Sequence, residues 1–325
     1  MTMASIDTGA STLLEISAPL RVLVLGGNGF LGRHAVAALC EAGASVSIGT
    51  RRPERIDEST WGRTLREVRF ESLLSRQAWL PLLSNIDVVI NCVGILRQRP
   101  GESYEAIHHH APAALASACA QTGVRFIHTS ALGLHEGAKS RFLSSKLRGE
   151  VAIRASGCDY ALVRPSLLDG VGGFGATWLR GLSRSPVHLI PRGARGGIAA
   201  LVATDFGLAL AALARLPHLA AHRDVELGGL HHYGYGEYLR ELRSSYTVRH
   251  AWQVPLPNWM ARVGAHLCDV FHFSPFSYGH WLLLQRDNIP RPNRLPELLG
   301  RDPLVIRPRA ATSASPASPA DALAK

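Results

Sequence analysis

Lysine and acidic residues are scarce in this chain. Its 325 residues include three lysines, at positions 139, 146 and 325, and 25 aspartates and glutamates against 35 lysines and arginines. The net charge of +10 therefore comes from arginine and from the shortage of acids. Such a charge permits contact with anionic nucleotides or phospholipid headgroups. The arginines are scattered and no zinc-finger or stacking-aromatic motif accompanies them, so we expect no nucleic-acid partner.

Cysteines and long apolar runs are scarce as well. The five cysteines lie far apart without a CxxC pair, which favours reduced thiols in a cytoplasmic protein over a disulfide framework. Residues 1–19 contain no lysine or arginine, so neither a secretory signal nor a basic presequence is expected there. The most apolar window, residues 198–214, is shorter than the roughly 20 residues that span a bilayer and contains Asp205. We therefore predict no transmembrane helix and at most a peripheral membrane contact.

From residue 20 onward, short β-branched runs alternate with helical patterns. This alternation is typical of an α/β protein with a doubly wound parallel Rossmann sheet. The predicted strands are residues 21–25, 45–49, 67–70, 87–93, 125–131 and 160–166. The predicted helices are residues 30–42, 75–84, 105–122 and 143–155.

The alternation loosens after residue 170, and this divides the chain. Residues 20–170 form the predicted Rossmann domain, and residues 171–305, rich in Gly, Pro, His and Trp, form a smaller C-terminal lobe on the substrate side. Within that lobe, helix 204–215 is expected to return and cover the sheet. Residues 1–19 and the Ala/Ser/Pro-rich residues 306–325 are predicted to be a disordered leader and tail.

A glycine-rich turn follows the first predicted strand. The stretch VLVLGGNGFLGRHAV places Gly26, Gly29 and Gly32 between an apolar strand and an amphipathic helix that begins with Phe30 and Leu31. A tight turn needs residues without Cβ, a diphosphate needs close backbone approach, and a helix N-terminus offers unpaired N–H groups. The strand before the turn and the helix after it therefore predict an NAD(P)-binding turn rather than a merely structural one.

Two arginines follow the second predicted strand, at a position where an NAD-selective dehydrogenase usually has an acid. Arg51 and Arg52 can pair with a 2′-phosphate, which indicates that NADP(H) is preferred over NAD(H); a solvated basic loop is the alternative. Glu71, just past the third predicted strand, is a candidate partner of the adenine amino group. An exposed loop carboxylate would explain Glu71 equally well.

The fourth predicted strand ends in the sequence INCVG. Open α/β sheets bind ligands in the crevice at the carboxyl ends of their strands. Asn91, Val93 and Gly94 are therefore expected to lie close to the adenine-side ribose and the diphosphate.

These motifs resemble the atypical branch of the extended short-chain dehydrogenase/reductase superfamily, whose members are NAD(P)-binding and NAD-dependent epimerase/dehydratase-like. The likeness is carried by LGGNGFLGR (25–33), NCVG (91–94), HTSALG (128–133) and RPSLLDG (164–170). More narrowly, VINCVGIL, FLSSKLRGE and LVRPS are similar to relatives of the nucleotide-binding accessory subunit of respiratory complex I. The resemblance covers about residues 20–215, with a vaguer likeness in LLLQRDN (282–288).

The resemblance implies roles for several residues. Ser130 would orient the substrate carbonyl, Lys146 would bind the nicotinamide ribose, and Pro165 and Ser166 would shape the nicotinamide pocket. A hydroxyl at a strand end often only satisfies a nearby backbone group, so the role of Ser130 stays open.

One catalytic group of the family is missing. Its ordinary members use a tyrosine four residues before the lysine as the proton donor or acceptor, but here that position is Phe142. Losing general acid catalysis costs about 10² to 10⁴ in rate. Tyr104 and the tyrosines between residues 233 and 238 are conceivable substitutes.

Two further patterns have simple explanations. Consecutive residues of a regular helix point about 100° apart, so His108 to His110 cannot all bind one ion, and we predict no metal site. In residues 257–273, large apolar residues including Trp259, Val263 and Leu267 lie at helical spacing, which ordinarily indicates a core face. A lipophilic substrate tunnel or a shallow membrane contact is the alternative.

Two functional hypotheses follow. The first is an NADP(H)-binding atypical short-chain dehydrogenase/reductase that transfers hydride to or from a carbonyl or hydroxyl of a small, lipophilic substrate without the usual tyrosine. The second is a catalytically silent nucleotide-binding accessory or sensor protein linked to a respiratory or quinone-related assembly. Phe142 favours the second, and Lys146 fits both because cofactor binding needs it in either case.

Overall fold

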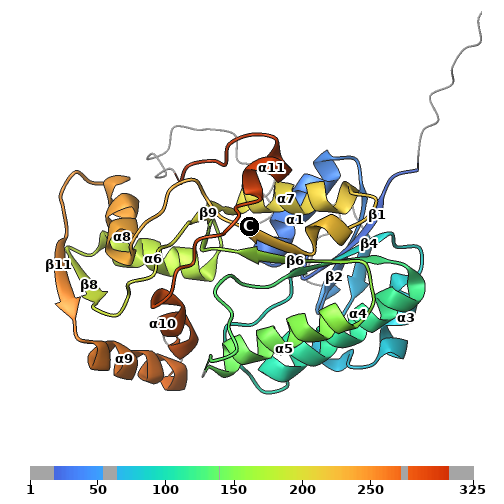
Figure 1. Ribbon diagram of the computed structural model, residues 1–325, viewed down its shortest axis with the longest axis horizontal. Coiled ribbons are helices and arrows are strands. Elements are labelled where there is room, and N and C mark those ends of the chain that lie inside the picture. Colours follow the sequence, from blue (N-terminus) through green and yellow to red (C-terminus); the bar gives the residue numbers. More distant parts are fainter. Residues whose placement is uncertain (1–17, 54–63, 139, 272–276, 307–325) are drawn as a thin grey trace, which may run out of the picture.

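A seven-stranded, all-parallel sheet forms the centre of the fold (Figure 1). Its spatial order is β10-β6-β5-β4-β1-β2-β3, and every neighbouring pair runs parallel. The strands are β1 (Arg21–Leu25), β2 (Ser45–Thr50), β3 (Thr64–Glu67), β4 (Val88–Asn91), β5 (Arg125–Thr129), β6 (Tyr160–Pro165) and β10 (Asp224–Leu227). The strand order reverses at β1 and β4, so the predicted doubly wound Rossmann sheet is confirmed.

The computed structural model describes residues 18–53, 64–138, 140–271 and 277–306. The predicted leader and tail lie outside these residues except for residues 18, 19 and 306, so their disorder stays a prediction. Within the described ranges, no helix has both the length and the apolar character needed to cross a membrane.

Helices cover both faces of the sheet. One face carries α1 (Phe30–Glu41), α7 (Ala203–Arg215) and α11 (Leu295–Leu299), and the other carries α3 (Arg76–Leu83), α4 (Ala111–Thr122) and α5 (Arg141–Ala155). In β1, Val22 and Val24 pack toward the first group and Leu23 and Leu25 toward the second. Alternate residues of a strand point to opposite faces, so a run that is apolar throughout is buried on both sides.

Helix α7 returns from the second half of the chain to cover the sheet, over nearly the residues predicted. Gly207 allows a close approach to α1, since a Cβ on Gly207 would lie 2.4 Å from the carbonyl oxygen of His34. Strand β10 and helix α11 join the same layers. More of residues 171–305 than the helix alone therefore packs with the Rossmann core.

The third strand begins and ends earlier than predicted. It spans Thr64–Glu67 rather than residues 67–70, and Phe70 opens the short 3-10 helix η2 (Phe70–Ser72). Val68 and Phe70 are 4% and 1% exposed and belong to the core on this side of the sheet. Val68 and Phe70 are thus apolar because the turn after the strand is buried, and in the sequence such a turn looks like part of a strand.

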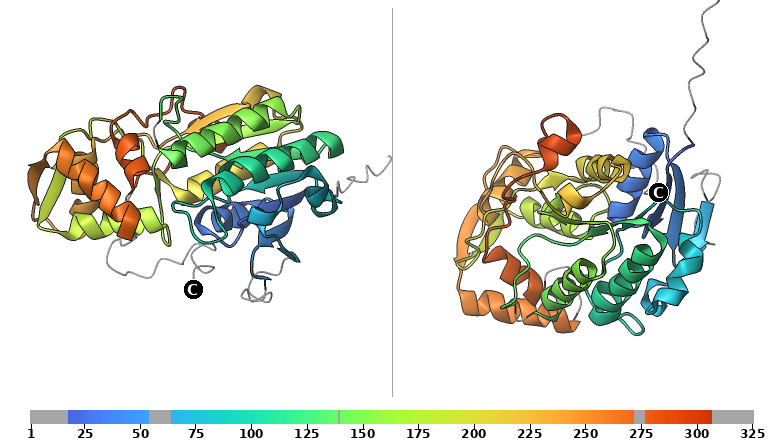
Figure 2. Two further views of the ribbon diagram at one scale, coloured as in Figure 1. Left: turned by 90° about the horizontal axis from the view of Figure 1, so that it is seen from below. Right: turned by 45° about the vertical axis from the view of Figure 1, so that its right-hand side comes forward.

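Most remaining elements form a second lobe, at the opposite end of the molecule from α3 (Figures 1 and 2). They are α6 (Phe174–Arg184), β8 (Val187–Pro191), α8 (Tyr235–Ser244), β11 (Trp252–Leu256), α9 (Asn258–Phe271) and α10 (Tyr278–Leu284). Strands β7 (Leu168–Asp169) and β9 (Leu201–Val202) pair with each other, and Leu168 and Leu201 pack in the Rossmann core. Strands β8 and β11 form a parallel ribbon of their own. A separate apolar core, which includes Leu179 and Leu242, joins α6 to α8.

Helix α9 turns its large apolar residues outward. Trp259, Val263 and Phe271 are 68%, 50% and 66% exposed, whereas Ala261 and Ala265 are 4% and 0% exposed. The core-face prediction for this segment is therefore wrong. The alanines form the buried side because they are small enough to pack closely against α10.

Candidate functional site

The glycine turn between β1 and α1 has the conformation that a diphosphate site requires. Gly26 has a φ of +69°, a left-handed conformation that favours glycine. A Cβ on Gly32 would lie 2.1 Å from the carbonyl oxygen of Gly26, so the helix can pass this close to the turn only with glycine there. The N–H of Gly29 donates to the same oxygen at 2.9 Å and closes the turn.

A cavity of about 1010 Å³, the cofactor cleft, opens at this turn and at the ends of β2 and β4. The predicted cofactor residues on its wall are Gly26, Gly29, Arg51, Arg52, Glu71, Val93 and Gly94. Oε2 of Glu71 is buried and has no hydrogen-bond partner in the described part of the chain. A buried acceptor without a donor is unfavourable until a ligand supplies one. An adenine amino group would do so, and the residues present therefore fit a dinucleotide.

The two arginines beside the cleft differ in their contacts. The guanidinium of Arg51 pairs with the carboxylate of Glu102, which also lines the cleft. Arg52 is exposed, and its backbone N–H donates to Thr50 Oγ1 at 3.4 Å. A 2′-phosphate at this place would therefore compete with a resident carboxylate for Arg51.

A second cavity of about 480 Å³, the apolar cavity, adjoins the cleft. The two share a wall made of Gly29, Cys92, Val93, Gly94 and Ile95. Most other lining residues are apolar and include Phe30, Leu31, Leu167, Trp178, Ile198 and Leu283. Ser130 and Lys146 also line the apolar cavity. The structure thus brings the predicted catalytic pair together on the wall of the cavity that adjoins the cofactor cleft.

Lys146 carries its charge in a poorly solvated place. Its side chain is partly buried, and burial lowers the pKa of the ammonium group from its ordinary 10.5 to about 8, while Glu150 acts in the opposite direction. Nζ lies 5.8 Å from the centre of the Phe142 ring. Lys146 therefore holds a proton at neutral pH but can release it readily.

Ser130 follows β5 on the same wall and lies near Glu150. Burial would raise the pKa of Glu150, but Arg164 and, more weakly, the Ser130 hydroxyl keep this carboxyl charged. The contact with Ser130 falls outside hydrogen-bond geometry, and Ser130 Oγ is buried without a partner among the described residues. Arg164, by contrast, bonds Glu150 at 2.8 and 2.5 Å. The Ser130 hydroxyl is thus available to a ligand oxygen.

Phe142, the residue predicted to replace a catalytic tyrosine, stands in a cluster of rings. The His280 ring stacks on it with centroids 5.8 Å apart, and Tyr104 and His108 meet it edge-on at 5.7 and 5.5 Å. The Tyr104 hydroxyl donates to the carbonyl oxygen of Leu96 at 2.9 Å, and burial raises its pKa. Tyr104 is therefore a poor substitute for the missing phenol.

His280 places a neutral imidazole on the wall of the apolar cavity. Ser277 Oγ accepts the backbone N–H of His280 at 3.2 Å and lies 2.6 Å from its Nδ1. When the Ser277 hydroxyl donates to Nδ1, the ring proton is on Nε2, and we assign this tautomer. Burial lowers the pKa of the ring to about 4. His280 therefore offers one N–H donor, without a charge, at neutral pH.

Two tyrosines of α8 also line the apolar cavity. The hydroxyl of Tyr238 is buried and has no hydrogen-bond partner among the residues that the structure describes. Burial raises the pKa of Tyr235 to about 12 and that of Tyr238 as well. Both hydroxyls thus stay protonated at neutral pH and can donate a hydrogen bond, but they are weak acids.

Two buried histidines hold the wall that the cavities share. His108 Nε2 accepts the N–H of Ile95 at 3.2 Å. Asn91 donates from Nδ2 to His128 Nδ1 at 3.0 Å and accepts the N–H of Val93 at 2.9 Å. Burial lowers the pKa of His108 well below its ordinary range and that of His128 to about 3, so both rings are neutral. Asn91 therefore shapes the cofactor cleft without lining it.

Pro165 and Ser166 lie beside the apolar cavity and do not line it. The Ser166 hydroxyl donates to the carbonyl oxygen of Asn288, which ties the end of β6 to the segment LLLQRDN. The next two residues, Leu167 and Leu168, form the wall instead. Pro165 and Ser166 thus support the cavity wall, which Leu167 and Leu168 form.

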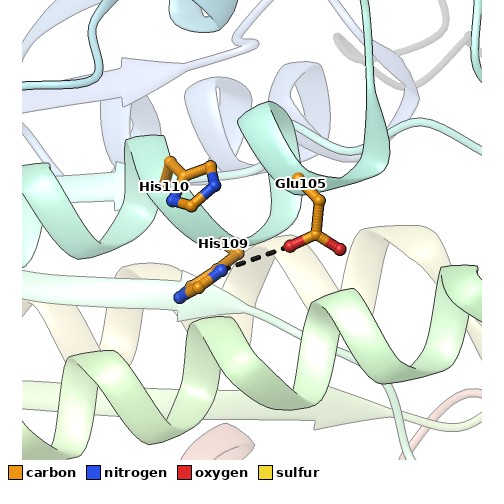
Figure 3. A group of neighbouring side chains, drawn as sticks. All are labelled: Glu105, His109 and His110. Atoms are coloured by element: carbon orange, nitrogen blue, oxygen red, sulfur yellow. Dashed lines mark hydrogen bonds and ion pairs between the residues drawn. The ribbon is translucent and has the colours of Figure 1, made fainter.

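The histidine run lies on a π-helix, η3 (Ala106–His110), and not on the regular helix assumed from the sequence. The side chains of Glu105, His109 and His110 converge, with their ligand atoms all within 4.8 Å of one another (Figure 3). The Glu105 carboxylate already bonds the guanidinium of Arg148, whose positive charge would oppose a cation. We assign no metal to this cluster.

Sequence reasoning missed Glu102 and His280. Glu102 belongs to no motif, and Tyr238 was named only as one of several tyrosines that could replace the phenol. His280 precedes the weakly matching LLLQRDN, which was the one available signal near it. These residues reach the site only because distant segments fold together.

The fold, the glycine turn and the adjoining cavities define a dinucleotide-binding protein of the oxidoreductase type. A family model described as NAD(P)H-binding matches residues 26–177. The chain is 31% identical over 216 residues to a ceramide reductase from Caulobacter vibrioides, a match that spans 66% of each protein. A nucleoside-diphosphate-sugar epimerase from Staphylococcus aureus shares the fold with a TM-score of 0.71 at 16% identity, over 89% of this chain and 99% of that one. An NADPH-dependent quinone oxidoreductase from Escherichia coli does so with a TM-score of 0.63 at 16% identity, over 87% and 96%.

The chain therefore matches an NAD(P)H-binding family over residues 26–177, and its fold has structural neighbours among the NAD-dependent epimerases/dehydratases and related reductases. This confirms the family predicted from the motifs. The narrower likeness to relatives of a complex I accessory subunit stays a prediction.

Proposed function

We propose that this protein is an NADP(H)-dependent reductase of a long-chain lipid carbonyl. The observation that carries the proposal is an apolar cavity of about 480 Å³ that adjoins the cofactor cleft and has Ser130 and Lys146 on its wall. Aliphatic chains gain free energy by leaving water for such a space, whereas a sugar would find few hydrogen-bond partners there. The 31% identity to a ceramide reductase supports a ceramide-type lipid as the substrate class.

The proton for the reaction comes from Lys146. When bound, the reduced nicotinamide supplies a hydride to the carbonyl carbon. The carbonyl oxygen takes up a proton as its double bond becomes single, and Phe142 has none to give. The Lys146 ammonium, with a pKa of about 8, is charged at neutral pH and acidic enough to transfer one. It has three donors, so a bond to the nicotinamide ribose leaves others for the substrate, and solvent restores the proton.

Ser130 and His280 position the same oxygen. The Ser130 hydroxyl and the Nε2–H of His280 are neutral donors on the wall of the apolar cavity. Hydrogen bonds from both would polarise the carbonyl and direct its oxygen toward Lys146. Tyr238 contributes a further donor for a second polar group of the lipid, such as an amide oxygen.

The cofactor preference rests on Arg51 and Arg52. The end of β2 carries no acid, and both arginines line the cleft. The 2′-phosphate replaces the Glu102 carboxylate as the partner of Arg51, because it carries more charge and accepts two hydrogen bonds. Calorimetry with Arg51→Asp, Arg52→Ala should show NADPH weakened far more than NADH. Equal weakening of both would refute the phosphate assignment.

A reduction assay tests the proposed function. Purified protein, NADPH and a ceramide-type lipid in its ketone form should yield the corresponding alcohol, identified by mass spectrometry, with NADPH consumed in equal amount. A short-chain ketone is the matched control for the apolar cavity and should react more slowly. NADPH binding without reduction of any lipid ketone would show that the proposal is wrong.

Phe142 favours a second candidate function. Without the phenol, the protein would be a catalytically silent nucleotide-binding accessory or sensor protein, linked to a respiratory or quinone-related assembly. Tight NADPH binding with no oxidation across a broad panel of carbonyls would support it. In that case a gain of carbonyl reduction in Phe142→Tyr would reveal a complete site that lacks one group.

A further inference from the structure

The end of the second lobe exposes an apolar surface. In the β8–β11 ribbon, Val187, Leu189, Trp252 and Val254 are 43%, 55%, 79% and 42% exposed. Trp252 lies opposite Val187 and Val254 opposite Leu189 in the register of the two strands. Residues two apart on a strand share a face, so these four side chains form one patch.

Helix α9 follows β11 along the chain and exposes a second row of apolar residues. Trp259, Val263, Leu267 and Phe271 follow at intervals of four residues and are 68%, 50%, 46% and 66% exposed. Such spacing places them along one side of the helix. The ribbon diagrams show β8, β11 and α9 together at the end of the molecule away from α3 (Figures 1 and 2). We call these four residues and the four of the ribbon the end face.

The charged residues near the end face are mainly basic. Arg192, Arg195, Arg249 and Arg262 are exposed. The acids nearby are Asp269, whose carboxylate accepts the N–H of Tyr278 at 2.9 Å, and Glu237 and Glu241 of α8, a helix that contacts β8. An apolar surface bordered by arginines complements a bilayer with anionic headgroups. In a symmetric dimer the arginines would face one another, so a second copy of the chain is the poorer match.

The end face also lies one helix away from the apolar cavity. Trp281 of α10 packs in one cluster with Ala261 and Ala265 of α9. The same helix α10 supplies His280 and Leu283 to the cavity wall. A bilayer that touched the end face would therefore be close to the place where a lipid must bind.

We propose that the end face docks on the surface of an anionic lipid bilayer, with Trp252 and Trp259 at the level of the headgroups, and that the lipid substrate is collected there. Tryptophan is favoured at this level because its ring is apolar and its N–H is polar. The proposal rests on the proposed function for the substrate alone. Docking itself requires neither cofactor nor turnover, so the two can be tested separately.

Co-sedimentation of the purified full chain with lipid vesicles tests the docking. Binding is expected with vesicles of phosphatidylglycerol and phosphatidylcholine and should be about tenfold weaker with phosphatidylcholine alone. The double variant Trp252→Ser, Trp259→Ser should weaken binding by about tenfold or more. Val151→Ser is the matched control, since Val151 is 58% exposed on α5, far from the end face in sequence, and should bind as the natural protein does.

A charge variant and an oligomer measurement complete the test. Arg192→Gln, Arg249→Gln should abolish the preference for anionic vesicles, with circular dichroism and NADPH affinity unchanged. Absence of vesicle binding, or equal losses in Val151→Ser, would overturn the proposal. So would a dimer in sedimentation velocity that the tryptophan variant abolishes, because a second copy would then cover the end face. Reduction of a micellar lipid without vesicle binding would refute docking and support the proposed function. Vesicle binding without reduction would support docking and refute the proposed function.

Discussion

Replacing Lys146 by methionine should stabilise the fold while abolishing turnover. Burial lowers the pKa of the ammonium group from 10.5 to about 8. A change of that size corresponds to about 3 kcal/mol between the charged and neutral forms. The folded protein therefore pays this free energy at every pH below about 8, where the lysine is charged. Methionine has a similar length and no charge to desolvate, so Lys146→Met should gain up to about 3 kcal/mol at pH 7.

The pH dependence provides the decisive measurement. Between about pH 8 and pH 10.5 the unfolded chain binds more protons at this lysine than the folded chain, so the natural protein becomes more stable as the pH rises through that window. Lys146→Met lacks this contribution. Urea denaturation of both proteins at several pH values should therefore show a stability difference that is largest below pH 8 and nearly vanishes above pH 10.5.

Other groups that titrate in this range act equally in both proteins and cancel in the difference. A variant that is less stable than the natural protein at pH 7 would contradict the reasoning. A difference that stays constant from pH 7 to pH 10 would contradict it as well, because the ammonium group would then be solvated. NADPH affinity measured alongside reports whether the cofactor cleft is intact.

The rate of carbonyl reduction should fall about tenfold per pH unit above pH 8, because Lys146 then lacks its proton; a flat profile to pH 10 would assign the donor elsewhere. Phe142→Tyr adds a phenol near Lys146 and should raise kcat by up to about 10². Unchanged steady-state kinetics would contradict the proposed geometry. Glu71→Gln should weaken NADPH and NADH alike by about tenfold in calorimetry, since one acceptor oxygen is lost. Glu102→Gln frees Arg51 and should raise the affinity for NADPH severalfold with the affinity for NADH unchanged. Equal changes in both affinities would show that Glu102 does not compete with the 2′-phosphate for Arg51.

Most of the sheet is predictable because its central strands are contiguous runs rich in apolar residues. Five of the six predicted strands, such as residues 21–25, end within two residues of the observed ones, since burial on both faces removes any ambiguity about which side is inside. The third strand fails because Val68 and Phe70 are buried after the strand has ended. Helix α9 fails for a different reason, because helical spacing reveals a stripe of large residues but not whether that stripe faces the core or water.

The two halves of the site also differ in how well the sequence predicts them. The cofactor cleft is predictable because its glycines, arginines and strand ends lie in local motifs whose geometry follows from the strand-turn-helix order. The apolar cavity is assembled from α5, α8 and α10, so Lys146 was recognisable by its motif, Tyr238 only by its residue type, and His280 not at all. The motif predicted the position of Ser130 but not the environment of its hydroxyl. That hydroxyl lacks a hydrogen-bond partner among the described residues because Glu150 bonds Arg164 instead.

The π-helix η3 has a consequence for how this site tolerates change in chain length. A π-turn bonds each residue to the fifth one along and thus holds one residue more than an α-turn. Deleting a single residue from Ala106–His110 would restore ordinary helical register and rotate the preceding turn, with Tyr104, by about 100° relative to α4. His108 would then lose the N–H of Ile95. The shape of the cofactor cleft, whose wall includes Ile107 of this segment, therefore depends on a surplus residue in a helix.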